Sequence, residues 1–238
     1  GLLGAALIVA GLRPHAPPWC LGLGRLCVEQ GVFLCLVIGV GALLLPLIAG
    51  TRAPADLGTS PREAARALGY AAAGGAVFAT LVLEQAGAPR IGPLLRAAVV
   101  GIGLASGGPP WQRPARPGAH RGLVRLAVWL IPVGLAASGV WPDYRVPALH
   151  VLFIGGFSLL AFAVATHVAL GHLALGDLAT GRPPAVVFLG ATFMLAMLAR
   201  VAADWSQSYF DHLGWAAGAW LAGSAVWLAF LGPKLLRP

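Results

Sequence analysis

The sequence predicts an all-α fold, a polytopic bundle of about seven to eight transmembrane helices. Of its 238 residues 58% are hydrophobic and only 10% are charged, whereas a soluble domain averages about 25% charged residues. The mean hydropathy is +0.82. Long apolar runs indicate bilayer-spanning helices, each of which needs about 20 such residues. These runs are continuously apolar, whereas the strands of a membrane barrel alternate apolar and polar residues.

We expect a single integral-membrane domain over residues 1–238, with eight spans of which the first is incomplete. Stretches rich in Pro and Gly separate the apolar runs and would end the helices. In the last span, Gly214, Gly218 and Ala222 form a stripe of small residues that predicts close helix packing. The spans are expected near residues 1–12, 26–49, 67–83, 91–106, 123–140, 146–172, 185–203 and 214–232.

The net charge of +8 comes from basic residues in short loops, which suits membrane orientation and argues against nucleic-acid binding. The loops after the second, fourth and sixth spans, with the C-terminal tail, hold ten of the 16 Lys and Arg residues. The positive-inside rule therefore places the C-terminus in the cytoplasm. The chain opens at Gly1 inside an apolar run, which we interpret as a processed or fragmentary chain.

The run from Val146 to His172 holds no Asp, Glu, Lys or Arg, but it carries three histidines, at 150, 167 and 172. Ionisable groups at membrane depth are costly and indicate a function by default. On a continuous α-helix, His150 and His172 would lie about 33 Å apart and face within about 40° of each other. No two of the three histidines can then chelate one metal ion, so each needs partners from other helices.

Two sets of histidines fall at matching membrane levels. The expected periplasmic set would suit copper or haem iron, for which neutral imidazole is a good ligand; it comprises His15, His150 and the pair Asp211–His212. The expected cytoplasmic set has two arginines near it for an anionic group such as a haem propionate; it comprises His120, His167 and His172, with Arg121 and Arg182. The alternative for the loop histidines, at 15, 120 and 212, is a solvated imidazole with no ligand.

The remaining charged residues are few. Glu29, Glu84 and Asp204 lie near span ends, where they are expected to reach the interface. Arg200 is expected either to pair with Asp204 at i,i+4 or to serve an anionic ligand. No motif of a hydrolase, a protease, an ATPase or a c-type haem protein is present. The sequence therefore assigns no catalytic residue and leaves open whether the protein is an enzyme.

The block LHVLFIGGFSLLAFAVATHVALGH, followed by TGRPP, resembles the signature of the NnrS family. His167 stands where Arg is commoner in the family, and LALGD is inserted before TGRPP. Residues 39–54 and the tail SAVWLAFLGPKLLRP, with Arg200, also resemble family segments. The likeness covers the C-terminal two thirds of a typical member and lacks its N-terminal Trp-His-x-His-Glu-Met motif. The matching residues are His150, Gly155, Gly156, Leu170, Gly171, His172, Gly181, Arg182 and Pro183.

The resemblance implies a bacterial inner-membrane protein that contains haem and copper and is linked to nitric oxide and nitrosative stress. It implies His150 and His172 as ligands; the candidate cofactor site then comprises His150, His167, His172 and Arg182, and the candidate metal ligands are His150, His172, His15 and His212. The expected partners are the lipid bilayer and a small gas such as nitric oxide. Two alternatives remain, a small-molecule transporter and a structural subunit of a membrane complex.

Overall fold

The computed structural model describes residues 1–50, 61–107 and 114–236, and over these ranges the chain is helical and without strands. Six helical stretches are long and apolar enough to cross a membrane: Pro18–Ala49, Glu63–Gln85, Ala119–Val140, Pro142–His172, Gly176–Ala203 and Tyr209–Leu235. The predicted all-α membrane fold is confirmed. The expected first and fourth spans are helices too, but they are shorter, at 10 and 17 residues.

The chain divides into two compact units. Unit 1 comprises residues 1–47, 52–109 and 135–142, and unit 2 comprises residues 48–51, 110–134 and 143–238. That the whole chain forms a single membrane domain stays a prediction.

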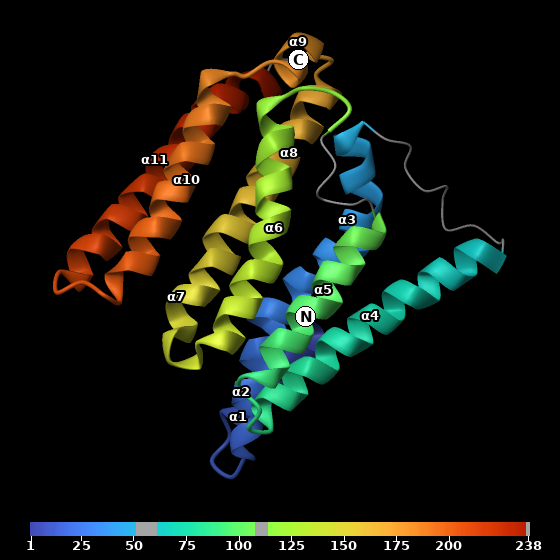
Figure 1. The fold of residues 1–238 in the computed structure, drawn as a ribbon, viewed down its shortest axis with the longest axis vertical. Coiled ribbons are helices and arrows are strands. Elements are labelled where there is room, and N and C mark those ends of the chain that lie inside the picture. Colours follow the sequence, from blue (N-terminus) through green and yellow to red (C-terminus); the bar gives the residue numbers. More distant parts are fainter. Residues whose placement is uncertain (51–60, 108–113, 237–238) are drawn as a thin grey trace. The chain divides into compact units, whose positions relative to one another are not determined.

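Unit 1 is built around one long span and a helical hairpin. The span runs without interruption through α2, a π-helix η1 and α3, and the hairpin pairs α4 with α5 (Figure 1). A core of Leu23, Leu26, Cys27 and Leu81 joins the span to the hairpin. The bounds are α1 Leu2–Gly11, α2 Pro18–Leu26, η1 Cys27–Gly31, α3 Val32–Ala49, α4 Pro61–Gln85 and α5 Ile91–Gly107.

A buried polar network crosses unit 1 between η1, α4 and α5. The Arg96 side chain is 1% exposed and pairs through Nη2 with Glu84 Oε2 at 2.5 Å. Its Nε donates to Thr80 Oγ1 at 3.2 Å, and its Nη1 donates to Gln30 Oε1. Gln30 is itself fully buried on the π-helix. The expectation that Glu84 reaches the interface is wrong, because the guanidinium of Arg96 holds its carboxylate inside the bundle.

Unit 2 contains the last three long spans and most of α6. Helices α10 and α11 form an antiparallel hairpin, drawn in orange and red in Figure 1. The bounds are α6 Ala119–Val140, η2 Pro142–Tyr144, α7 Arg145–His150, the π-helix η3 Val151–Ser158, α8 Leu159–His172, α9 Gly176–Thr180, α10 Pro184–Ala203 and α11 Tyr209–Leu235.

The span from 142 to 172 is not one α-helix, because its middle is π-helical. The separation and angle expected between His150 and His172 on a continuous α-helix therefore do not hold, since i→i+5 bonding changes the rotation per residue. Two flanking features favour the irregularity. A Cβ on Gly134 of α6 would lie 2.6 Å from Leu152 N, so the two backbones nearly touch. Gly155 packs closely against Met197 and Gly156 against Ile131, and neither position has room for a Cβ atom.

The predicted packing stripe on the last span is not the face that α11 packs with. Gly214, Gly218 and Ala222 are exposed, and an added Cβ on either glycine meets no atom within 4 Å among the described residues. The contact with α10 is made instead by Gly223, whose added Cβ would lie 2.2 Å from Thr192 Oγ1. Four-residue spacing identifies a small-residue face but not which helix covers it.

The substitution Glu84→Gln should lower the free energy of unfolding by about 3–5 kcal/mol, because it leaves the buried Arg96 charge without its counter-ion. The measurement is the thermal unfolding midpoint in detergent. Glu29→Gln is the control, since Glu29 is exposed and its substitution should change stability by less than about 0.5 kcal/mol. Equal effects of the two substitutions would show that the pair contributes nothing.

Candidate functional site

Two imidazoles of the expected cytoplasmic set lie in contact within unit 2. His120 Nε2 and His167 Nδ1 are 3.0 Å apart, and the ring centroids are 5.1 Å apart. His120 is 1% exposed and His167 is half-buried. One ring must donate an N–H and the other must accept it, so at least one of the two nitrogens carries no proton. The structure places His120 in the first turn of α6, whereas a loop position was predicted from the sequence.

The position of His120 depends on a tight junction between the start of α6 and the segment after α9. Gly118 has φ +147°, and a Cβ there would lie 2.5 Å from Ala179 O. The next amide, Ala119 N, donates to Gly181 O at 3.0 Å. Only glycine combines this backbone conformation with so close an approach. The backbone contacts of Ala179 and Gly181 thereby fix the start of α6, which carries His120.

Arg121 brings a buried positive charge to the same place. Its residue is 6% exposed, and its Nη1 donates to Pro117 O at 2.6 Å. Its Nε has no hydrogen-bond partner among the described residues. The charge of Arg121 acts on both imidazoles. This side of the histidine pair therefore offers a free donor to an anionic group.

Apolar and aromatic side chains pack between α8, α9 and α11, close to His167 in the chain. Ala169, Leu170 and Leu231 form a buried cluster, covered by residues of α9 and by Trp227. Trp227 Nε1 donates to Thr166 Oγ1 at 2.8 Å, next to His167 in the chain. Phe162 packs edge-on against Trp227 at a centroid distance of 4.9 Å. These contacts hold α8 against α11.

The other predicted members of this set lie apart from the contact. His172 ends α8 with an exposed side chain, and Arg182 is exposed after α9. His15 is an exposed residue of the loop between α1 and α2 in unit 1. Their roles as ligands stay predictions.

His150 and His212 share one arrangement at the other end of unit 2. Each ring bonds through Nδ1 to the carbonyl oxygen four residues earlier, Val146 O at 2.8 Å and Ser208 O at 3.0 Å. A backbone bond of this kind fixes the tautomer of a metal-ligating histidine and leaves Nε2 as the ligand atom. Both rings are half-buried.

Arg200 lies near His150 and is paired as expected. Its Nη1 is 3.6 Å from Asp204 Oδ2, and its Nη2 is 3.4 Å from Tyr209 Oη. The charges of Arg200 and Asp204 both act on the His150 ring. The i,i+4 pairing of Arg200 with Asp204 is thus confirmed, and a role for Arg200 toward an anionic ligand stays a prediction.

Across the described ranges, no three His, Cys, Asp or Glu side chains converge as a complete metal site would require. The closest arrangement is the His120–His167 pair. Copper or zinc binds imidazole nitrogen at about 2.0–2.1 Å, so two cis ligands lie about 3.0–3.4 Å apart. The observed 3.0 Å fits two cis ligands of one ion. It does not fit the two axial ligands of a haem, because the iron would have to lie between them.

The charged centre of unit 1 was not predicted from the sequence. Arg96, Gln30 and Thr80 were not singled out, and Glu84 was assigned to the interface. The available signal was Arg96 itself, an arginine five residues into a predicted span, which needs a buried counter-charge. Nothing in the spacing identified Glu84 as that counter-charge, since the two lie on different helices.

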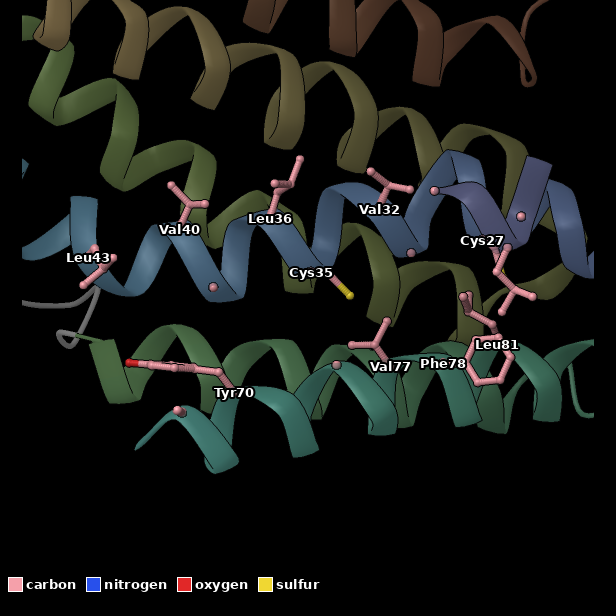
Figure 2. A pocket seen from close by; sticks show the side chains of 17 residues that line it. Cys27, Val32, Cys35, Leu36, Val40, Leu43, Tyr70, Val77, Phe78 and Leu81 are labelled. Atoms are coloured by element: carbon pink, nitrogen blue, oxygen red, sulfur yellow. The ribbon is translucent and has the colours of Figure 1, made fainter. Parts of the chain in front are cut away.

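An apolar cavity of about 650 Å³ lies between α1, η1, α3 and α4 in unit 1 (Figure 2). None of its lining side chains is charged; the polar side-chain groups are the Tyr70 hydroxyl and the thiols of Cys27 and Cys35. Such a surface offers no ligand set for haem or for a hard metal ion.

A family model for the NnrS protein matches residues 1–238, the whole chain. No curated protein and no solved structure matches the chain. The match agrees with the six long apolar helices and with the segment from His150 to Pro183 that carries the resemblance. The protein is a multi-pass membrane protein and belongs to the NnrS family.

Proposed function

We propose that this NnrS-family protein binds copper, haem or both through imidazoles in its membrane domain and takes part in the response to nitric oxide and nitrosative stress. The observation that carries the proposal is the His120–His167 contact. Two imidazole nitrogens at 3.0 Å inside a helical bundle have the spacing of two ligands on one ion. Imidazole nitrogens bind copper well, and a cysteine thiolate is not required as a further ligand.

His120 Nε2 and His167 Nδ1 would hold the copper ion as a cis pair. When bound, copper supplies reversible binding of a small uncharged ligand and one-electron chemistry. The chain itself contributes two things: it holds the two nitrogens 3.0 Å apart, and it places the Arg121 charge near both rings. The proton shared between the two rings would have to leave when the metal binds. The apolar bundle also admits a gas such as nitric oxide, which partitions into hydrocarbon.

A haem would need a different residue. His150 and His212 both keep Nε2 available for a metal, because a backbone carbonyl binds each Nδ1, and we choose His150 because the family resemblance implies it. Arg200 lies near it for an anionic edge of the group. The conformation at His150 thus supports the role that the family resemblance implies for it.

Removal of either imidazole of the pair should weaken copper binding by at least about tenfold, since even outer-shell changes cost roughly 10–100-fold. The experiment is titration of the purified protein with copper, read by metal analysis and by the nitrogen couplings of the Cu(II) electron paramagnetic resonance spectrum. The variants are His120→Ala and His167→Ala. Glu29→Gln, at an exposed position of unit 1, is the control and should bind copper as the unmodified protein does.

The same preparations, loaded with haem, separate the haem site from the copper site. His150→Ala should lose the Soret band, and His120→Ala should keep it. A protein that takes up neither metal nor porphyrin when both are supplied in excess would overturn the proposal. A transporter or a structural subunit would then remain, and a thermal shift that depends on substrate separates those two.

Gly118→Ala should lower both the unfolding midpoint and the copper affinity. A methyl group there meets Ala179 O in a backbone conformation that alanine rarely adopts, so the start of α6 and the His120 ring must move. Gly122→Ala is the matched control on the same helix, because its added Cβ meets no described atom within 4 Å. Equal copper affinity in the two variants would show that the junction does not position His120.

The proposal includes the bacterial inner membrane as the location, with the C-terminus in the cytoplasm. The distribution of basic residues supports this orientation. A fluorescent protein that matures only in the cytoplasm, fused after Pro238, should fluoresce. A periplasmic phosphatase fused at the same point should be inactive, and the reverse result would invert the orientation.

A further inference from the structure

The apolar cavity of unit 1 opens on membrane-spanning helices. Its walls come mainly from the spans Pro18–Ala49 and Glu63–Gln85. Leu36, Val40 and Phe78 line it and are also exposed, so the groove is reached from the hydrocarbon region and not from water. Molecules that can enter are therefore apolar or amphipathic. Its volume of about 650 Å³ lies in the range of about 300–1,000 Å³ that is usual for ligand sites.

The groove is long and narrow. Along α4 its lining runs from Ala67 to Leu81, a rise of about 21 Å. The groove has free space beside two of its lining glycines, Gly39 and Gly74. An added Cβ on Gly39 meets no atom within 4 Å, and one on Gly74 would lie 3.8 Å from Cys35 Sγ. The groove is therefore long enough and apolar enough for an acyl chain.

One end of the groove is polar. Figure 2 shows Tyr70 at the end near Leu43, with its hydroxyl group directed away from the apolar wall. Tyr70 also lines a neighbouring cavity of about 570 Å³, in which Arg66 takes part. Arg66 lies one turn before Tyr70 on α4 and is exposed. It stands within two turns of the start of α4 at Pro61, where the helix leaves the hydrocarbon region.

We propose that this groove binds one anionic phospholipid, with an acyl chain along α3 and α4 and the phosphate at Arg66 and Tyr70. The apolar wall is complementary to the chain, and the guanidinium with the phenol hydroxyl is complementary to the phosphate. A zwitterionic lipid would also fill the apolar groove, but the cation of its headgroup offsets the phosphate charge that Arg66 would bind. A second copy of the protein would offer an apolar helix face and no phosphate for Arg66.

The test uses the full chain, purified in detergent and relipidated with phosphatidylglycerol or phosphatidylcholine of identical acyl chains. Native mass spectrometry counts the retained lipid, and the unfolding midpoint reports its effect. The unmodified protein should retain one phosphatidylglycerol and be stabilised more by it than by phosphatidylcholine. Gly39→Leu fills the groove and should reduce retention of either lipid at least tenfold. Arg66→Gln should keep chain binding and abolish the preference for phosphatidylglycerol.

Gly75→Leu is the matched control. Gly75 is exposed on α4, lines neither cavity, and its added Cβ meets no atom within 4 Å, so lipid retention should be unchanged. If Gly39→Leu does not fold, Gly74→Val on the opposite wall fills the same groove. Equal retention of the two lipids by the unmodified protein would overturn the proposal. So would unchanged retention in the groove-filling variant, or a dimer that the variant dissociates while no lipid is bound.

Discussion

A polar side chain inside an oil-like helical bundle is stable only where a partner lies within hydrogen-bond distance. This constraint accounts for the organisation of both units. In unit 1 it draws Arg96, Glu84, Thr80 and Gln30 together from three elements. In unit 2 it joins His120 to His167. The apolar residues specify that helices form, and these few polar contacts specify which faces of the helices meet.

Each of the two π-helices contains or adjoins a polar residue. Gln30 belongs to η1, and His150 directly precedes η3. Short π segments inside α-helices occur often at functional sites, because they redirect side chains that a regular helix would point elsewhere. Here η1 turns Gln30 toward Arg96.

The fold class and the positions of the long helices follow from the sequence, since continuous apolar runs bounded by Pro and Gly leave few alternatives. The pairing of Arg200 with Asp204 also followed, because it is local. The sequence predicted that His120, His167 and His172 could lie together, whereas the structure brings only His120 and His167 into contact. Partners on different helices, such as Glu84 and Arg96, depend on packing that no spacing along one helix reveals. The π-helices were not predicted from the sequence, because their glycines are just as common where regular membrane helices pack against one another.

The π-helix at 151–158 also affects how the span tolerates changes in length. A π segment holds an extra residue without adding a full turn. A relative that lacks one residue between Val151 and Ser158 can close the segment into α-helix and keep His167 facing His120. The same deletion between Leu159 and Thr166 would rotate His167 by about 100° and separate the two rings. Single-residue gaps in this span should therefore fall before Leu159.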